Sequence, residues 1–176
     1  MKFVQVDGTK EEVPVCIQPG FFFGKLNETV GELDCLYLSI YTTDLPSVNP
    51  DADLKPVFFW IHGGGFVLGS GDLGVGADYL LESGLVVVTI NYRLGPMGFM
   101  ALEGSSIAGN QGLKDQLMAL RWVKENIANF GGDPNRITIA GESAGAVRYL
   151  VIASSKTFSN CFIKCSCPCF VSSWEG

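Results

Sequence analysis

The stretch ITIAGESAGA, residues 137–146, places a serine between two glycines directly after an apolar run. The run RITIA, residues 136–140, has the length and composition of a buried β-strand. Ser143 follows in the pattern Gly-x-Ser-x-Gly, formed with Gly141 and Gly145. A strand, a tight turn of small residues and a helix hold a serine hydroxyl where it can act as a nucleophile. We therefore predict a nucleophile elbow at Ser143, against the alternative of a serine that only happens to occupy a glycine turn.

The segments before this serine predict an α/β domain. Residues 36–42 alternate between apolar and polar side chains, which predicts a half-buried strand. Residues 56–62 and 85–93 are continuously apolar runs, which predict strands that are covered on both faces. Apolar residues at steps of three or four along GLKDQLMALRWVKENIANF predict a helix that ends at Gly131 and Gly132. Buried strands that alternate with helices indicate a largely parallel sheet. The predicted strands are residues 36–42, 56–62, 85–93 and 136–140, and the predicted helices are residues 77–83 and 112–130.

The loop HGGGF, residues 62–66, adds a second part of the same chemistry. The carbonyl oxygen of an ester becomes negatively charged when a serine attacks it, and backbone N–H groups must stabilise that charge. A run of glycines lets the backbone approach a substrate without side chains in the way. A loop of this type after an earlier strand works together with the N–H group of the residue after the serine. Two motifs in the expected order, each after its own strand, favour acyl transfer through a serine.

Composition and the remaining motifs argue against other classes of protein. The net charge of -6 argues against nucleic acid or an anionic membrane as the main partner, and no apolar tract is long enough to span a bilayer. The sequence GSGDLG, residues 69–74, matches G-x-G-x-x-G but lacks the strand, helix and acid of a dinucleotide site. Four cysteines near the C-terminus have a spacing that is unusual for zinc, so we expect free thiols and no bound metal.

The chain resembles the N-terminal part of a type-B carboxylesterase, the family that includes cholinesterases and insect carboxylesterases. The matching stretches are GELDCLYLSIYT, PVFFWIHGGGFVLGSG, VVVTINYRLGPMGFM and GNQGLKDQLMALRWVKENIANFGGDPNRITIAGESAGA, in family order. The resemblance implies an α/β-hydrolase fold, with residues 1–164 forming the N-terminal part of one domain and a sheet that ends just after the nucleophile elbow. Residues 165–176 are rich in cysteine and match nothing in the family, so we expect an unrelated and disordered tail.

Carried over residue by residue, the resemblance also implies the roles of individual residues. The implied roles are nucleophile for Ser143, oxyanion-hole N–H donors for Gly64, Gly65 and Ala144, active-site neighbours for Glu142 and His62, a disulfide between Cys16 and Cys35, a glycosylation sequon at Asn27, and structural support for Asn91, Tyr92 and Arg93. A disulfide and a sequon favour an oxidising compartment, whereas the N-terminus carries no secretory signal, so the sequence leaves the location open.

The catalytic base of this chemistry is missing from the sequence. In α/β-hydrolases the serine is followed by an acid and then a histidine. Here His62 is the single histidine, and Glu175 is the single acid after Ser143. We expect a serine carboxylic ester hydrolase by descent, acting on a small-molecule ester without a cofactor, in a truncated and inactive form. The alternatives are an esterase-like binding or adhesion protein without catalysis, and a short isoform that binds esters without turnover.

Overall fold

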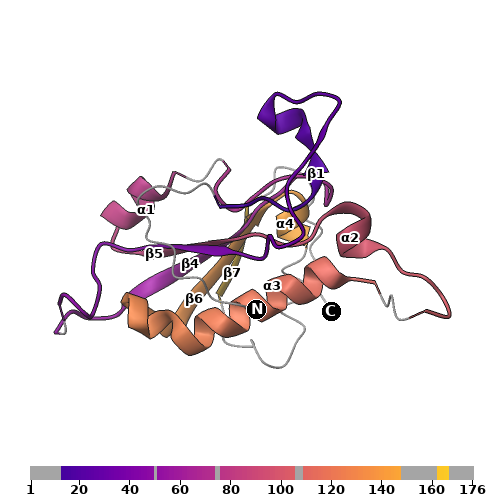
Figure 1. Cartoon of the computed structure of the whole chain (residues 1–176). Helices are drawn as coiled ribbons and strands as arrows, with labels where there is room; N and C mark the ends of the chain where they lie inside the picture. The colour runs from indigo at the N-terminus through magenta and orange to yellow at the C-terminus, as the bar shows by residue number, and fades with distance from the viewer. Residues whose placement is uncertain (1–12, 50, 74–75, 106–108, 148–161, 167–176) are drawn as a thin grey trace.

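The centre of the molecule is a five-stranded mixed sheet with the strand order β3-β5-β4-β6-β7 (Figure 1). The computed structural model describes residues 13–49, 51–73, 76–105, 109–147 and 162–166. Strands β5, β4, β6 and β7 are parallel, and β3 is antiparallel to β5, which confirms the largely parallel sheet. The strands are β3 Leu38–Tyr41, β4 Lys55–Ile61, β5 Val86–Ile90, β6 Gly132–Glu142 and β7 Phe162–Ser166.

Strands β4 and β5 differ in how completely they are covered. All five residues of β5 are buried, as its continuous apolar run predicts. In β4, Val57, Phe59 and Ile61 are buried, but the intervening Phe58 and Trp60 are half-exposed and stack on each other at 6.2 Å between ring centroids. The expectation that both faces of β4 are covered was therefore wrong for the described part of the chain. One face of β4 enters the core, while the described helices do not fully cover the other.

The helices follow the strands as an α/β arrangement requires. Helix α3 runs along one side of the sheet, α1 lies near one end of it, and α2 and α4 lie toward the other end (Figure 1). Helix α2 was not predicted from the sequence, although the proline in its first turn is a known start signal. The helices are α1 Ala77–Glu82, α2 Gly95–Phe99, α3 Gln111–Asn126 and α4 Ala144–Val147, with short 3-10 turns η1 Gly20–Phe23 and η2 Ile127–Phe130.

Helix α3 buries most of the face that its apolar stripe predicts, but the buried face is rotated in the first part of the helix. Leu120, Val123 and Ile127 are fully buried, as expected. The first part of the stripe, at residues 113 and 117, is only partly buried, whereas Asp115 and Gln116 are buried instead. The stripe alone could not predict this rotation, because a carboxylate is buried only where a partner compensates its charge. Helix α3 itself ends at Asn126, and the helical segment continues through η2 to the predicted end, a glycine with a left-handed backbone (residue 131, φ 80°).

The sheet does not end after the nucleophile strand, and this part of the sequence-based prediction was wrong. Strand β7 pairs in parallel with the outer edge of β6, from Thr138 to Glu142. Strand β6 is also longer than predicted, because it begins at Gly132 and reaches the regular register only after an irregularity. The predicted division at residues 164 and 165 falls inside β7 and remains a prediction. Cys161, which precedes the predicted tail, and Cys167 and Cys169 within it lie outside the described residues.

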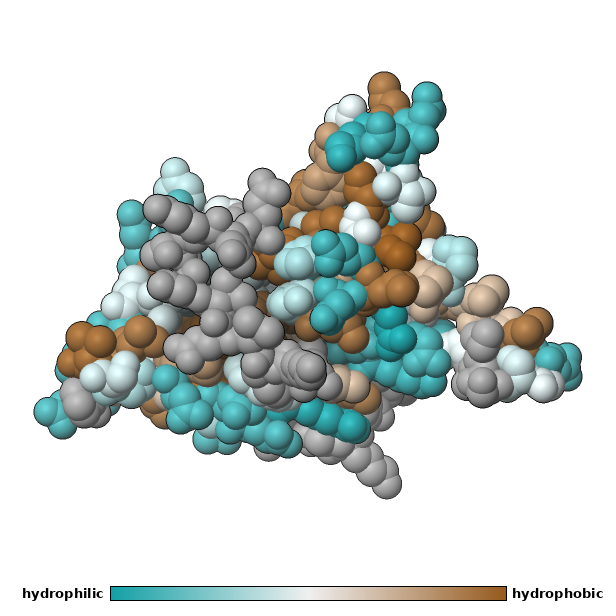
Figure 2. Space-filling view, viewed as in Figure 1, coloured by the Kyte–Doolittle hydropathy of each residue, from teal (hydrophilic) through white to brown (hydrophobic). Residues whose placement is uncertain are grey.

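A disulfide-closed loop, residues 16–35, projects from the sheet (Figure 1). It contains the two-residue strands β1 Gln18–Pro19 and β2 Thr29–Val30, which pair in antiparallel fashion, and the turn η1. Figure 2 shows hydrophobic side chains on this projecting segment, where Phe21, Phe22 and Leu26 are exposed. Within the described residues, no helix combines the length and apolar character that crossing a membrane requires.

Candidate active site

Three loops of the candidate site leave the sheet at the same level. Ile61, the last residue of β4, pairs with Ile90 of β5 and with Gly141 of β6. Loops that follow the carboxyl ends of neighbouring parallel strands meet at one edge of the sheet. The loop after β4, residues 62–71, which we call the glycine loop, therefore lies beside the turn that carries Ser143, although the two are far apart in the sequence.

Ser143 occupies the sharp turn between β6 and α4. Its backbone is left-handed (φ 51°), a conformation that is strained for a residue with a side chain, and the residue is exposed. A Cβ atom at Gly145 would lie 2.2 Å from the carbonyl oxygen of Ile61, and one at Gly141 would lie 2.7 Å from the carbonyl carbon of Gly145. The two glycines thus let α4 turn back against β4 and leave the serine at the tip of the turn.

The glycine loop faces this turn. A Cβ atom at Gly63 would lie 2.9 Å from the carbonyl oxygen of Glu142 and 3.4 Å from the Cβ atom of Ser143. The next two glycines have left-handed backbones, with φ 105° at Gly64 and 60° at Gly65. Among the described residues, the N–H groups of these two glycines donate to no acceptor.

His62 begins the glycine loop but is enclosed within the protein. It is only 4% exposed, and its ring stacks on Tyr92 with centroids 4.2 Å apart. The Nδ1 atom donates to the carbonyl oxygen of Gly63 at 2.8 Å, which assigns the proton to Nδ1 because a carbonyl can only accept. A Cβ atom at Gly69 would lie 2.4 Å from the same Nδ1 atom, so the ring is held between Tyr92 and the returning limb of the loop.

The segment after β5 supports the glycine loop through side-chain hydrogen bonds. The Oδ1 atom of Asn91 accepts from the N–H group of Gly71 at 2.8 Å, and its Nδ2 atom donates to the carbonyl oxygen of Pro14 at 2.9 Å. The hydroxyl of Tyr92, which is fully buried, donates to the carbonyl oxygen of His62 at 2.9 Å. These contacts are the structural support that the resemblance implies for this segment.

Arg93 joins the same segment to helix α3. Its backbone N–H, Nε and Nη2 atoms donate to the carboxylate of Asp115 at 3.1, 2.8 and 2.6 Å. The hydrogen bond to this carboxylate raises the pKa of Arg93 above its ordinary value. The backbone of Arg93 is tightly enclosed as well, since a Cβ atom at Gly98 or Gly112 would lie 2.1 or 2.5 Å from its carbonyl oxygen.

A further support comes from Gln18, whose role the sequence did not reveal. This side chain is 2% exposed, and its Nε2 atom donates to the carbonyl oxygens of Cys16 at 3.0 Å and Gly69 at 2.9 Å. Its Oε1 atom accepts from the N–H group of Gly69 at 2.7 Å. The only available signal was a glutamine two residues after a cysteine, which by itself does not predict a partner far along the chain.

A match to a family model decides where this arrangement belongs. The model of the Carboxylesterase family matches residues 2–165, which is most of the chain. The chain belongs to the carboxylesterase family.

Several curated carboxylesterases are similar in sequence. Esterase E4 of Myzus persicae is 49% identical over 128 residues, which cover 72% of this chain and 23% of the relative. The juvenile hormone esterase of Heliothis virescens is 42% identical over 156 residues, which cover 86% of this chain and 28% of the relative. The chain thus spans less than a third of the length of these relatives.

Solved carboxylesterase structures confirm the α/β-hydrolase fold. The carboxylesterase of Geobacillus stearothermophilus, at pH 6.2, superposes with a TM-score of 0.73 and 42% identity, over 90% of this chain and 32% of that structure. The juvenile hormone esterase of Manduca sexta, solved with OTFP covalently attached, superposes with a TM-score of 0.71 and 36% identity, over 89% of this chain and 29% of that structure. The predicted fold and family are therefore confirmed for the part of the fold that this chain spans.

The structure brings most of the predicted site residues together at one edge of the sheet. The residues at this edge are His62, Gly64, Gly65, Glu142, Ser143 and Ala144, of which His62 and Ala144 are buried. The predicted disulfide between Cys16 and Cys35 is confirmed, with 4.8 Å between the Cα atoms. Asn27 is exposed in a turn of the projecting loop. Gln18 and Asp115 are the supporting residues that sequence reasoning missed.

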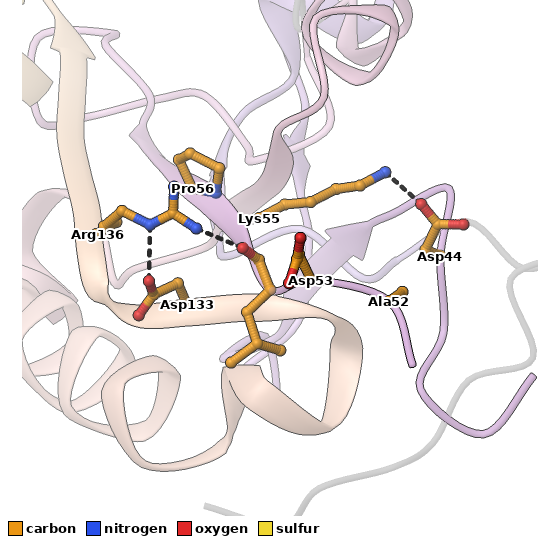
Figure 3. Close-up of a pocket in the computed structure, with 8 residues that line it drawn as sticks. Asp44, Ala52, Asp53, Lys55, Pro56, Asp133 and Arg136 are labelled. Carbon is orange, nitrogen blue, oxygen red and sulfur yellow. Dashed lines mark hydrogen bonds and ion pairs between the residues drawn. The ribbon is translucent and has the colours of Figure 1, made fainter. Parts of the chain in front are cut away.

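A cavity of about 560 Å³ lies at the opposite end of the strands, at the starts of β4 and β6 (Figure 3). Its charged side chains are largely paired with one another: Lys55 with Asp44, and Arg136 with Asp133 at 2.7 Å. The hydrogen bond from Arg136 lowers the pKa of Asp133 below its ordinary value. Because Ser143 follows the far end of β6, this cavity is separate from the candidate active site.

Proposed function

We propose that the protein is a carboxylic ester hydrolase that uses Ser143 as its nucleophile. The observation that carries this proposal is the left-handed Ser143 at a glycine-flanked turn, directly beside the glycine loop. The N–H groups of Gly64, Gly65 and Ala144 form the oxyanion hole. For Ala144, the first residue of α4, support comes from the general rule that the first N–H groups of a helix have no partner within it.

The proposed reaction has two steps. The Oγ atom of Ser143 attacks the carbonyl carbon of the ester while its proton passes to a base, and the carbonyl oxygen is stabilised by the oxyanion hole. The bond to the alcohol then breaks, and the alcohol leaves with the proton from the base. Water attacks the acyl-enzyme in the second step, releases the acid and restores the serine hydroxyl. This chemistry requires a small-molecule carboxylic ester and no cofactor.

We assign the single histidine to the support of the loop and not to catalysis. A general base must lie within hydrogen-bond reach of the proton that it removes. His62 is instead buried against Tyr92, with its Nδ1 proton donated to the carbonyl oxygen of Gly63. The triad acid and histidine are therefore proposed to lie outside these 176 residues, and the 176-residue chain by itself is proposed to be inactive.

Two neighbouring features complete the proposal. Glu142 is exposed beside Ser143, so its charge contributes to the field at the acyl group. Asn27, in the sequon Asn27-Glu28-Thr29, is accessible to glycosylation because it lies in an exposed turn. The confirmed disulfide fits a compartment in which both disulfides and glycans form.

A hybrid enzyme tests the role of Ser143. In esterase E4, the segment that matches this chain is replaced by the corresponding residues of this chain, so that the relative supplies the rest of the domain. The hybrid is expected to hydrolyse p-nitrophenyl butyrate and to react with a fluorophosphonate at Ser143. Ser143→Ala is expected to lower kcat by on the order of 10⁶-fold. Ser83→Ala, at the exposed end of α1, is the matched control and should leave the rate unchanged.

The same experiment decides between catalysis and binding. A folded hybrid that binds the ester without turnover, or whose turnover does not depend on Ser143, would refute the proposal. The first result would favour an esterase-like binding protein. The 176-residue chain, assayed in parallel, is expected to show no turnover.

A further inference from the structure

The glycine loop needs an external support if its N–H groups are to act as a preorganised oxyanion hole. Donors stabilise an oxyanion only when they lie within about 2.7–3.1 Å of its position. Glycine backbones have more conformational freedom than any others, so a loop with three successive glycines does not hold such a position by itself. The loop closes on itself, because the N–H group of Leu68 donates to the carbonyl oxygen of Gly64 at 3.1 Å. That contact fixes the shape of the loop but not its place relative to Ser143.

Two buried amide side chains fix the returning limb of the loop from different directions. Asn91 directly follows β5 and accepts a hydrogen bond from the N–H group of Gly71. Gln18 belongs to the disulfide-closed loop and binds both the N–H group and the carbonyl oxygen of Gly69. Among the described hydrogen bonds, those of Gln18 are the ones that join the disulfide-closed loop to the glycine loop.

Gly69, which Gln18 binds, packs directly against the first residues of the glycine loop. With φ 117° it packs so closely that a Cβ atom there would lie 2.4 Å from Nδ1 of His62 and 2.8 Å from the carbonyl oxygen of Gly63. Gly63 in turn lies against Ser143. A displacement of Gly69 therefore changes the beginning of the glycine loop, next to the nucleophile.

The backbone segment that carries Gln18 is itself held in place by several contacts. Cys16, two residues earlier, is joined to Cys35 and accepts from the Nε2 atom of Gln18. The peptide of Cys16 leaves no room for a side chain at Gly31, where a Cβ atom would lie 2.5 Å from its oxygen. Gln18 itself pairs with Val30 between β1 and β2. The backbone at Gln18 is thus fixed by contacts that do not depend on the hydrogen bonds between its side chain and Gly69.

We propose that Gln18 is a positioning residue for ester hydrolysis, because its amide pairs with the peptide of Gly69 and thereby sets the place of the oxyanion donors Gly64 and Gly65. This inference rests on the proposed function for its catalytic meaning. It links the Cys16–Cys35 disulfide to the active site through one side chain.

The test uses nuclear magnetic resonance on the ¹⁵N-labelled, oxidised 176-residue chain. In Gln18→Ala, the amide proton of Gly69 is expected to exchange about tenfold faster or more, because it loses its acceptor. The amide signals of Gly64 and Gly65 should shift or broaden in the same variant. Ile127→Val loosens the core under α3, remote from the loop, and should leave these three signals in place.

Gln18→Glu gives a readout that a merely structural role would not produce. A carboxylate keeps the acceptor for the N–H group of Gly69 but cannot donate to the two carbonyl oxygens, whereas a protonated carboxyl group can donate to one of them. The Gly64 and Gly65 signals of this variant should therefore depart from wild type at about pH 7 and return toward it at about pH 4. Wild type and Ile127→Val should show no such recovery.

Each outcome decides the inference. Unchanged Gly64 and Gly65 signals in folded Gln18→Ala would overturn it. If Gln18→Ala does not fold, Gln18→Glu decides the inference instead. The proposed role of Gln18 would be overturned if the Gly64 and Gly65 signals of Gln18→Glu match wild type at neutral pH. It would also be overturned if those signals are altered at neutral pH and do not recover on acidification. The measurement requires no ester hydrolysis, so an inactive hybrid would refute the proposed function without deciding the role of Gln18. Unchanged signals would likewise overturn the role of Gln18 without deciding the proposed function.

Discussion

Gly145 is the residue at which the nucleophile elbow tolerates a side chain least. In Gly145→Ala, the new Cβ atom would lie 2.2 Å from the carbonyl oxygen of Ile61 and 2.7 Å from that of His62. Both oxygens belong to the backbone at the end of β4, so neither can rotate away as a side chain would. To reach an ordinary contact of 3.4 Å, α4 and β4 must separate by more than 1 Å.

The cost of this separation can be bounded. Overpacking in a well-packed core typically costs about 1–3 kcal/mol, and a clash between backbone atoms belongs at the upper end or above. Alanine favours a helix over glycine by about 1 kcal/mol, which offsets part of the cost. We expect a net loss of about 2–3 kcal/mol in the free energy of unfolding. For a chain of this size, that lowers the Tm by about 4–12 °C, at 2–4 °C for each kcal/mol.

Two other glycines provide matched controls. Gly24 has a left-handed backbone (φ 72°) but no described atom within 4 Å of an added Cβ atom, so Gly24→Ala reports backbone strain alone, about 1–2 kcal/mol. Gly76, the N-cap residue of α1, has neither constraint, and Gly76→Ala should cost at most about 1 kcal/mol, the preference of an N-cap for glycine over alanine. Urea unfolding followed by circular dichroism gives the three values. The steric argument fails if Gly145→Ala is as stable as Gly76→Ala.

Three further changes test individual interactions of the fold. Asp115→Asn removes the charge of the carboxylate that accepts three hydrogen bonds from Arg93. We expect the free energy of unfolding to fall by about 2–3 kcal/mol, which is less than for a fully buried pair because Arg93 is partly exposed. Wild-type stability of this variant in urea unfolding would contradict the expectation. Cys16→Ser opens a disulfide with a sequence separation of 19 residues, which should cost about 3 kcal/mol under oxidising conditions and nothing under reducing ones. Burial, and then Asp72, raise the pKa of Tyr41 above 10.0, so the unfolded chain loses this proton first and stability should fall as the pH rises past 10.0. Tyr41→Phe should flatten that alkaline decline in thermal unfolding, and an unchanged pH profile would contradict the assignment.

The sequence determined those features that depend on neighbouring residues. A continuous apolar run predicted the buried strand β5, and a glycine after the apolar stripe predicted where the helical segment after α3 ends. The glycines around Ser143 and in the glycine loop were predictable for the same reason, because a tight turn or a left-handed backbone restricts the residue types at its own positions. The resemblance carried by these motifs also gave the family, the fold and the disulfide.

Only the tertiary structure decided which distant residues support the site. Asp115 and Gln18 are polar, and a polar residue is expected at the surface unless a partner compensates its burial. Their partners, Arg93 and Gly69, lie elsewhere in the chain, and no local pattern records such a pair. The position of β7 beside β6 is likewise a matter of strand pairing, which depends on how the whole chain folds back on itself. Local rules determined the elements and the nucleophile motif, whereas long-range hydrogen bonds between buried polar groups decided how these parts are held together.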